Sequence, residues 1–171
     1  MKKLGGIIVT MIGILFIVLS IIFGVIAEFK YERDIQSYWN LAVKASTVPK
    51  KAENIDRFVM ALEDCQFEGK YNALFLKTPD NSFDENLIAL KTLQQRLNDI
   101  QNMDISSFEY QKAIEQITEQ EMGNASAMRS IFHGIWYKNN YFFLWDWICG
   151  IQVIFSLWVI AMGGFYWNKN S

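Results

Sequence analysis

The chain has 171 residues, of which 51% are hydrophobic and 20% are charged, and its formal net charge is -2. This length leaves room for one small domain beside the apolar segments, which excludes a large multidomain enzyme. The 16 basic and 18 acidic residues are mixed along the chain without a basic stripe, which argues against nucleic-acid binding. Two cysteines cannot form the disulfide framework of a small secreted scaffold.

Two segments without any charge lie near the ends of the chain, residues 4–27 and 147–167. A helix needs about 20 predominantly apolar residues to cross a bilayer core, and both segments are long enough. The sequence therefore predicts an integral membrane protein with two spans. We expect an N-terminal transmembrane anchor over residues 1–27, a helical bundle over 28–140, and a C-terminal transmembrane helix with a short tail over 141–171.

Lysines flank the outer ends of both segments, with Lys2 and Lys3 before the first and Lys169 after the second. Because Lys and Arg near span ends favour the cytoplasmic side, both termini are predicted to be cytoplasmic and residues 28–140 extracytoplasmic. A secretory signal cleaved after Ala27 is the alternative, because small residues precede that position. The uncleaved anchor is favoured, since the apolar core of a signal usually has about 7 to 15 residues.

Each predicted span carries a stripe of small or polar residues along one face. At about 100° per residue, the members of each stripe project from a similar side of the helix. Small residues let helix backbones approach closely, and polar groups in hydrocarbon need hydrogen-bonding partners, so the stripes predict helix–helix interfaces. The two stripes can pack on each other, or at least one can dock a partner or a second copy. The predicted interface residues are Gly6, Thr10, Gly13, Ser20 and Gly24 in the first span and Cys149, Gln152, Ser156 and Gly163 in the second.

Aromatic residues cluster just before the second span and at its end. Tryptophan and tyrosine favour the two membrane–water interfaces, where their rings lie at the level of the headgroups. The sequence therefore predicts a membrane-interface belt composed of Trp136, Tyr141, Trp145, Trp147, Tyr166 and Trp167.

Between the spans, apolar residues recur at helical spacing in four successive segments. The first helix is expected from Glu28, the second from Pro49 to near Gly69, the third from Ser82 or Asp84, and the fourth from Ser106 or Ser107. The stretch between the second and third helices remains open, because its short apolar run fits either an extended segment or a loop.

Four amphipathic helices joined by short turns bury their apolar faces as a bundle, and an even number of helices returns the chain to the membrane. The predicted fold is all-α, a two-span transmembrane helical hairpin with an extracytoplasmic antiparallel four-helix bundle. In outline this architecture resembles the membrane-anchored four-helix ligand-binding modules of bacterial receptors, although no sequence motif is shared.

Few residues suggest chemistry. His133 is the only histidine, which removes most routes to a catalytic triad or a zinc site. The chain also lacks the Glu-x-x-His elements of di-iron bundles. Cys65 and Cys149 are expected to be unlinked buried thiols, with a disulfide as the alternative. We predict no catalytic residue, no metal site and no cofactor.

We therefore expect a non-enzymatic accessory or scaffolding subunit within the lipid bilayer. Little of the sequence is predicted to be cytoplasmic, so the chain should act through lateral helix contacts and its extracytoplasmic bundle. The expected partner is another integral membrane protein or a second copy of the chain. The first alternative is a sensor whose bundle binds a small molecule and signals through a separate membrane partner. A membrane enzyme with carboxylates at the bundle–membrane junction is the second.

Overall fold

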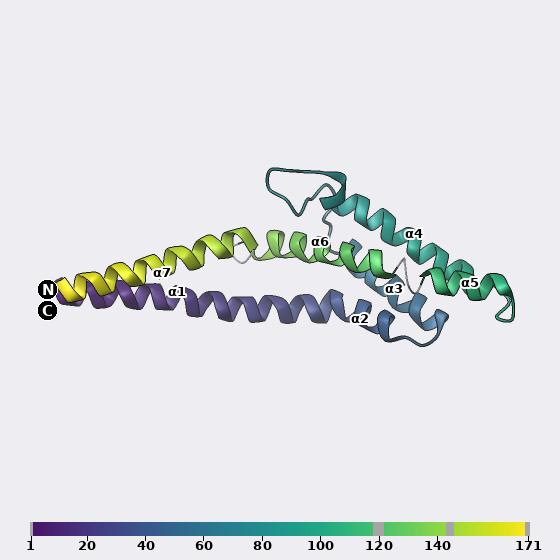
Figure 1. The fold of residues 1–171 in the computed structure, drawn as a ribbon, viewed down its shortest axis with the longest axis horizontal. Coiled ribbons are helices and arrows are strands. Elements are labelled where there is room, and N and C mark those ends of the chain that lie inside the picture. The colour runs from purple at the N-terminus through teal and green to yellow at the C-terminus, as the bar shows by residue number, and fades with distance from the viewer. Residues whose placement is uncertain (1, 118–121, 143–145, 170–171) are drawn as a thin grey trace. The chain divides into compact units, whose positions relative to one another are not determined.

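The computed structural model describes the backbone of residues 2–117, 122–142 and 146–169. Apart from loops and one isolated β-bridge, these residues are helical, so the prediction of an all-α chain is confirmed for them. The helices fall into two compact units (Figure 1). Unit 1 consists of Met1–Phe29 and Tyr137–Ser171, and unit 2 consists of Lys30–Trp136.

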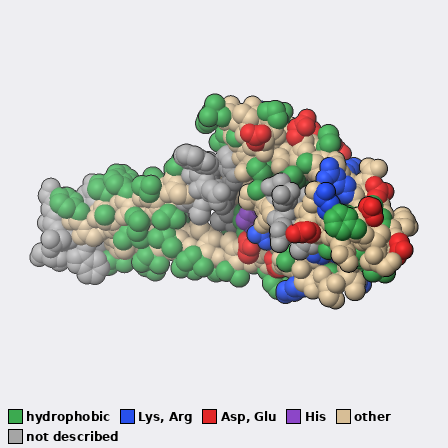
Figure 2. All heavy atoms as spheres, turned by 45° about the vertical axis from the view of Figure 1, so that its right-hand side comes forward, with side chains coloured by type: hydrophobic (Ala, Val, Ile, Leu, Met, Phe, Trp, Pro, Cys, Tyr) green, Lys and Arg blue, Asp and Glu red, His purple; other side chains and the backbone are tan. Residues whose placement is uncertain are grey.

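Unit 1 is built from two long helices, α1 (Lys2–Tyr31) and α7 (Asp146–Lys169), which lie side by side in Figure 1. Figure 2 shows hydrophobic side chains over these helices and the charged side chains over unit 2. Most large apolar side chains of α1 are exposed, namely Ile8, Val9, Met11, Ile12, Ile14, Leu15, Phe16, Val18, Leu19, Ile21, Ile22, Phe23, Val25, Ile26 and Phe29.

Among the described residues, one helix is long and apolar enough to cross a membrane, spanning Gly5–Lys44. The apolar part of α7 that the structure describes, Val153–Met162, is shorter than a membrane span.

A π-helical turn, η1 (Glu32–Gln36), lies between α1 and α2 (Ser37–Lys44). The backbone N–H of Ser37 donates to the carbonyl oxygen of Glu32, five residues earlier, which is the hydrogen-bond pattern of a π-helix. On both sides of this turn the same side of the helix faces the core of unit 2, since Tyr31, Ile35, Trp39 and Ala42 are all buried.

Two of the other helices of unit 2, α3 and α5, begin where the sequence supplies a suitable first turn. Pro49 lies in the first turn of α3, where its missing N–H leaves no hydrogen bond unmade. Ser107 caps α5, because its Oγ accepts a hydrogen bond from the backbone N–H of Tyr110 at 3.0 Å. The bounds are α3 (Val48–Glu63), a short 3-10 turn η2 (Pro79–Asn81), α4 (Phe83–Gln101), α5 (Phe108–Gln116) and α6 (Met122–Asn140).

A chain of aromatic contacts joins the helices of unit 2. The ring centroid of Phe58 on α3 lies 5.6 Å from that of Trp39 on α2 and 6.4 Å from that of Phe132 on α6. Phe132 in turn lies 5.5 Å from Phe83 at the start of α4, and Phe83 lies 5.9 Å from Phe67. These separations suit edge-to-face packing, so side chains from four helices and one loop form a common core.

The second predicted helix ends earlier than the sequence indicated. We expected it to run to near Gly69, but α3 ends at Glu63. Gln66 adopts a φ of 53°, which lies in the left-handed region and cannot continue a right-handed helix. The stretch left open by the sequence is a loop that is closed by an antiparallel β-bridge between Tyr71 and Ser82.

Candidate functional site

In unit 1 the two predicted stripes meet at Gly13 and Ser156. Both residues are buried, and Ser156 is 2% exposed. A Cβ atom added at Gly13 would lie 3.2 Å from the carbonyl oxygen of Ser156 and 2.8 Å from Cγ1 of Ile160. The backbones of α1 and α7 therefore approach so closely that a side chain at position 13 would collide with the opposite helix.

The other members of the first stripe have different surroundings. Gly6 is buried, and the Oγ1 of the half-buried Thr10 donates to the Gly6 carbonyl oxygen at 3.0 Å. The Oγ of Ser20 donates to the carbonyl oxygen of Phe16 at 2.9 Å. No described atom lies within 4 Å of a Cβ added at Gly24. Within the first stripe, Gly13 therefore makes a close contact with α7 that Gly24 does not make with any described residue.

Several predicted site residues have side chains outside the described part of the structure. In the second stripe these are Cys149, Gln152 and Gly163, and in the aromatic belt they are Trp145, Trp147, Tyr166 and Trp167.

The two belt residues that the structure describes lie in different units. Trp136 is buried in unit 2, with its ring centroid 5.4 Å from that of Tyr31. Tyr141 is half-exposed in unit 1, 6.3 Å from the ring of Tyr137. Contact of these rings with lipid headgroups stays a prediction.

The described part of unit 1 contains a long-range polar contact that the sequence did not indicate. The hydroxyl of Tyr137 donates to Oε2 of Glu28 at 2.8 Å, although the two residues are 109 positions apart. Glu28 follows directly on the uncharged stretch of α1. Its carboxylate therefore links the end of that stretch to the end of α6. Nothing in the local sequence pattern signals such a long-range pairing.

Among the described residues, no three His, Cys, Asp or Glu side chains converge to form a metal site. The ring of His133 packs against Tyr31 at 4.7 Å between centroids and an interplanar angle of 79°. Glu115 is exposed on α5, while Glu119 and Glu121 lie outside the described residues.

The thiol of Cys65 is free and its Sγ donates to the carbonyl oxygen of Ala61 at 3.3 Å. Burial, followed by the nearby charges of Asp64 and Asp34, raises the pKa of Cys65 to about 11. Since the thiolate is the nucleophile, this thiol is poorly reactive at neutral pH.

Unit 2 contains a cavity of about 210 Å³ between the α2–α3 turn, the C-terminal part of α4, and α5. Helical periodicity can show which apolar residues share a helix face, but it cannot show a cavity, because a cavity depends on how far neighbouring helices diverge. The lining is mainly aliphatic, with a lysine and two hydroxyl groups: Ala45, Ser46, Thr47, Val48, Lys51, Leu97, Ile100, Ile114 and Ile117.

The geometry thus presents two features, a close helix contact in unit 1 and a small cavity in unit 2. The chain matches no model of a protein family, no curated protein and no solved structure.

Proposed function

We propose that this chain is a non-enzymatic integral membrane protein that acts as an accessory or scaffolding subunit. In this proposal α1 and α7 form a two-span hairpin, and unit 2 is an extracytoplasmic helical bundle, in which α5 and α6 lie within the segment predicted as a single fourth helix. The observation that carries the proposal is the inverted burial of α1, which buries Gly6 and Gly13 and exposes nearly all its large apolar side chains.

This pattern suits a helix surrounded by lipid. Each large apolar side chain left in water forgoes roughly 1.5–3 kcal/mol of transfer free energy, and soluble monomers rarely expose large contiguous apolar surfaces. In a bilayer the same side chains are solvated by acyl chains, and helices associate where small residues allow close approach. The contact at Gly13 and Ser156 has this character.

The second span and the orientation are proposed from the uncharged stretch of α7 and from the lysines near the chain ends. Helix α7 extends over Asp146–Lys169 and includes the uncharged segment 147–167, which is long enough to cross a bilayer. Lysines near the two chain ends favour cytoplasmic termini. Unit 2 would then be extracytoplasmic.

The proposed accessory role depends on surfaces of the chain that a partner protein could contact. The small-residue face near Gly13 is occupied by α7, so a membrane partner would pack on the outward apolar faces of α1. The solvent-exposed surface of unit 2 offers a second contact region on the same chain. The partner is another integral membrane protein or a second copy of this chain.

The test is gentle solubilisation of native membranes, followed by size separation and mass spectrometry of what co-migrates with the chain. A companion at a fixed ratio is expected. Two matched variants locate its contact on α1, F16A/F23A on one face and L15A/I22A on another, because all four side chains are exposed. Loss of the companion in one variant only would identify the face.

Two outcomes would overturn this proposal. Migration as a lone monomer contradicts an accessory role. Detection of a mature chain beginning at Glu28 would show that residues 1–27 are a cleaved signal, as in the alternative reading.

The cavity favours a second candidate function, a sensor of small molecules. Its aliphatic lining with Lys51 and Thr47 suits a short-chain carboxylic acid, whose carboxylate would bind near the ammonium group. Binding to the folded state would raise the melting temperature of the full chain in detergent in a concentration-dependent way. I114W should fill the cavity and abolish that rise, while F108A, at an exposed position outside the lining, should retain it.

A further inference from the structure

The loop between α3 and α4 exposes an apolar tip. Phe75 is 93% exposed and Leu76 is 80% exposed, and the neighbouring Leu74 is also exposed. By contrast, Phe67 and Phe83 at the two ends of the loop are buried in the aromatic core. The loop is therefore anchored by two buried rings and holds adjacent apolar side chains away from the core of unit 2.

Hydrogen bonds hold the loop in this conformation. The backbone N–H of Asn72 donates to the carbonyl oxygen of Asn81 at 2.9 Å, and that of Phe83 donates to Lys70 at 2.9 Å. At the tip, Nδ2 of Asn81 donates to the carbonyl oxygen of Leu76 at 2.7 Å and to Oγ1 of Thr78 at 3.0 Å. The apolar tip is thus presented by an ordered loop.

The base of the loop lies at the end of unit 2 where the chain enters and leaves the unit. A Cβ atom added at Gly134 would collide with Oδ1 of Asn72, so the loop contacts α6 two residues before Trp136, the last residue of the unit. Trp136 packs against Tyr31, the second residue of the unit. The first and last residues of unit 2 and the base of the loop therefore lie at the same end of this unit.

The turn between α4 and α5 lies at the opposite end of unit 2. Helix α4 has 19 residues, which at 1.5 Å per residue places its two ends about 28 Å apart. Figure 1 shows the loop at one end of α4 and α5 at the other. This distant turn also exposes apolar side chains, Ile105 and Phe108, and so provides a matched comparison.

We propose that Phe75 and Leu76 insert into the headgroup–acyl boundary of the bilayer that holds unit 1. The inference rests on the proposed function, because it requires unit 1 to be embedded in that bilayer. Chain connectivity then keeps this end of unit 2 close to the lipid surface.

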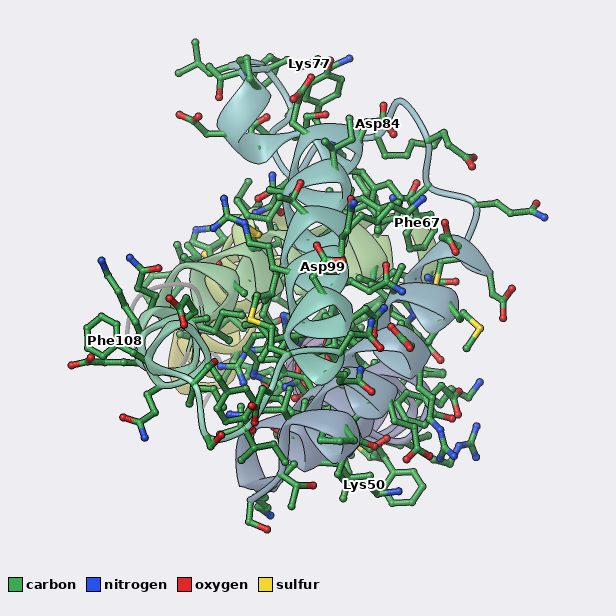
Figure 3. The ribbon with its side chains drawn as sticks, turned by 90° about the vertical axis from the view of Figure 1, so that its right-hand side faces the viewer. Lys50, Phe67, Lys77, Asp84, Asp99 and Phe108 are labelled. Carbon is green, nitrogen blue, oxygen red and sulfur yellow. The ribbon has the colours of Figure 1, made fainter. Side chains whose placement is uncertain are left out.

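The chemistry of the loop favours lipid over a protein partner. Nζ of Lys77 lies 5.3 Å from the ring centroid of Tyr71, and Figure 3 shows Lys77 at the outer edge of unit 2, beyond Asp84. Lysine and tyrosine beside an apolar tip are typical of the membrane interface. A stable protein interface buries about 800 Å² on each partner, which is far more than two side chains supply.

The test uses the full chain with both native cysteines replaced by serine, reconstituted into vesicles of phosphatidylcholine and phosphatidylglycerol. A fluorescent label is attached in turn to L76C, I105C and F16C. Quenching is then measured with brominated acyl chains and with aqueous iodide. We expect brominated lipid to quench the labels at positions 76 and 16 strongly and the label at 105 weakly. Adding F75S to the L76C protein should reduce lipid quenching several-fold.

Each contrary outcome has a distinct meaning. Equal quenching by lipid at positions 76 and 105 would overturn the insertion, whereas quenching at position 16 would still uphold the membrane anchor. A label at position 76 that is shielded from iodide but not quenched by lipid would assign the tip to a second copy of the chain and overturn the inference. A label at position 16 that lipid does not quench would overturn the proposed function as well.

Discussion

Helices α1 and α3 bury opposite kinds of residue. In unit 1, α1 buries the small residues Gly6, Gly13 and Ala27 and exposes most of its described isoleucine, leucine and phenylalanine side chains. In unit 2, α3 buries Ile55, Phe58, Val59 and Leu62 and exposes Lys50, Arg57 and Glu63. What a helix buries reflects what surrounds it: water drives large apolar side chains inward, whereas lipid leaves close backbone packing as the main attraction between helices.

The two units therefore depend on different interactions. Unit 2 is stabilised by aromatic rings that fill its core. Unit 1 is stabilised by close packing of two helix backbones, which is possible because Gly13 has no side chain. Substitutions that remove side-chain volume from the core should destabilise unit 2. Substitutions that add side-chain volume at the helix contact should disrupt the packing of unit 1.

The largest effect is expected from F58A. Phe58 is 1% exposed and contacts the rings of Trp39 and Phe132, so truncation leaves a cavity in the core. Such a change costs about 3–5 kcal/mol of unfolding free energy. Urea unfolding of the full chain in detergent, followed by circular dichroism, measures the loss.

F108A is the matched control for F58A. It removes the same ring from a position that is 74% exposed, and surface changes usually alter stability by less than about 0.5 kcal/mol. Similar losses for the two variants would contradict the assigned core.

The second effect concerns unit 1 and the variant G13L. The added side chain meets Ile160 and Ser156, so α1 and α7 must separate. Packed helix axes lie about 8–10 Å apart depending on the residues at the contact, so we expect a separation of about 2 Å. Spin labels on M11C and L157C, two exposed positions, would report this shift by double electron–electron resonance in a background with both native cysteines replaced.

G5L is the control for G13L, since no described atom lies within 4 Å of a Cβ at Gly5. It should leave the distance distribution unchanged. If G13L also leaves it unchanged, the close contact between α1 and α7 is wrong.

A smaller effect on stability is expected from G134A, because Gly134 in unit 2 lies close to the side chain of Asn72. The new methyl group would collide with the side-chain amide of Asn72, and overpacking typically costs about 1–3 kcal/mol. Removing the amide in N72A/G134A should recover part of the loss. Urea unfolding of the four members of this double-mutant cycle measures the coupling.

G123A provides the contrast for G134A. No described atom lies within 4 Å of a Cβ at Gly123 on α6, so alanine should raise stability by up to about 1 kcal/mol through helix propensity. If G134A were equally stabilising, the contact between the loop and α6 would be refuted.

The smallest effect near neutral pH concerns Cys65. Its pKa is raised from 9.0 to about 11, chiefly by burial, so the folded chain holds the thiol proton more tightly than the unfolded chain. The resulting stabilisation is fully present below about pH 9 and is lost as the pH rises towards 11. The difference in unfolding free energy between C149S and C65S/C149S should therefore change only in this alkaline range. A change between pH 6 and 8 would contradict the burial of the thiol.

Much of the secondary structure was predictable because apolar periodicity and capping residues are local signals. Pro49 marked the start of α3, and of the two predicted starts of the fourth predicted helix, Ser106 and Ser107, it is Ser107 that caps α5. The end of α3 was not predictable, because Gln66 adopts a positive φ without a glycine to signal it. The contact of Gly13 with Ser156 was one of two readings of the stripes, since spacing shows which residues share a face but not what covers that face.

Local sequence patterns are enough to predict the helical class, the two uncharged segments and the residues that share each helix face, because these depend on neighbours within a few positions. Which residues of each face are in contact emerges only from the folded chain. The tertiary structure buried Trp136 against Tyr31, paired Glu28 with Tyr137, opened the cavity beside Lys51, and held Phe75 and Leu76 outward. These features depend on distances between segments far apart in the chain, and such distances are set by packing of the whole unit rather than by local periodicity.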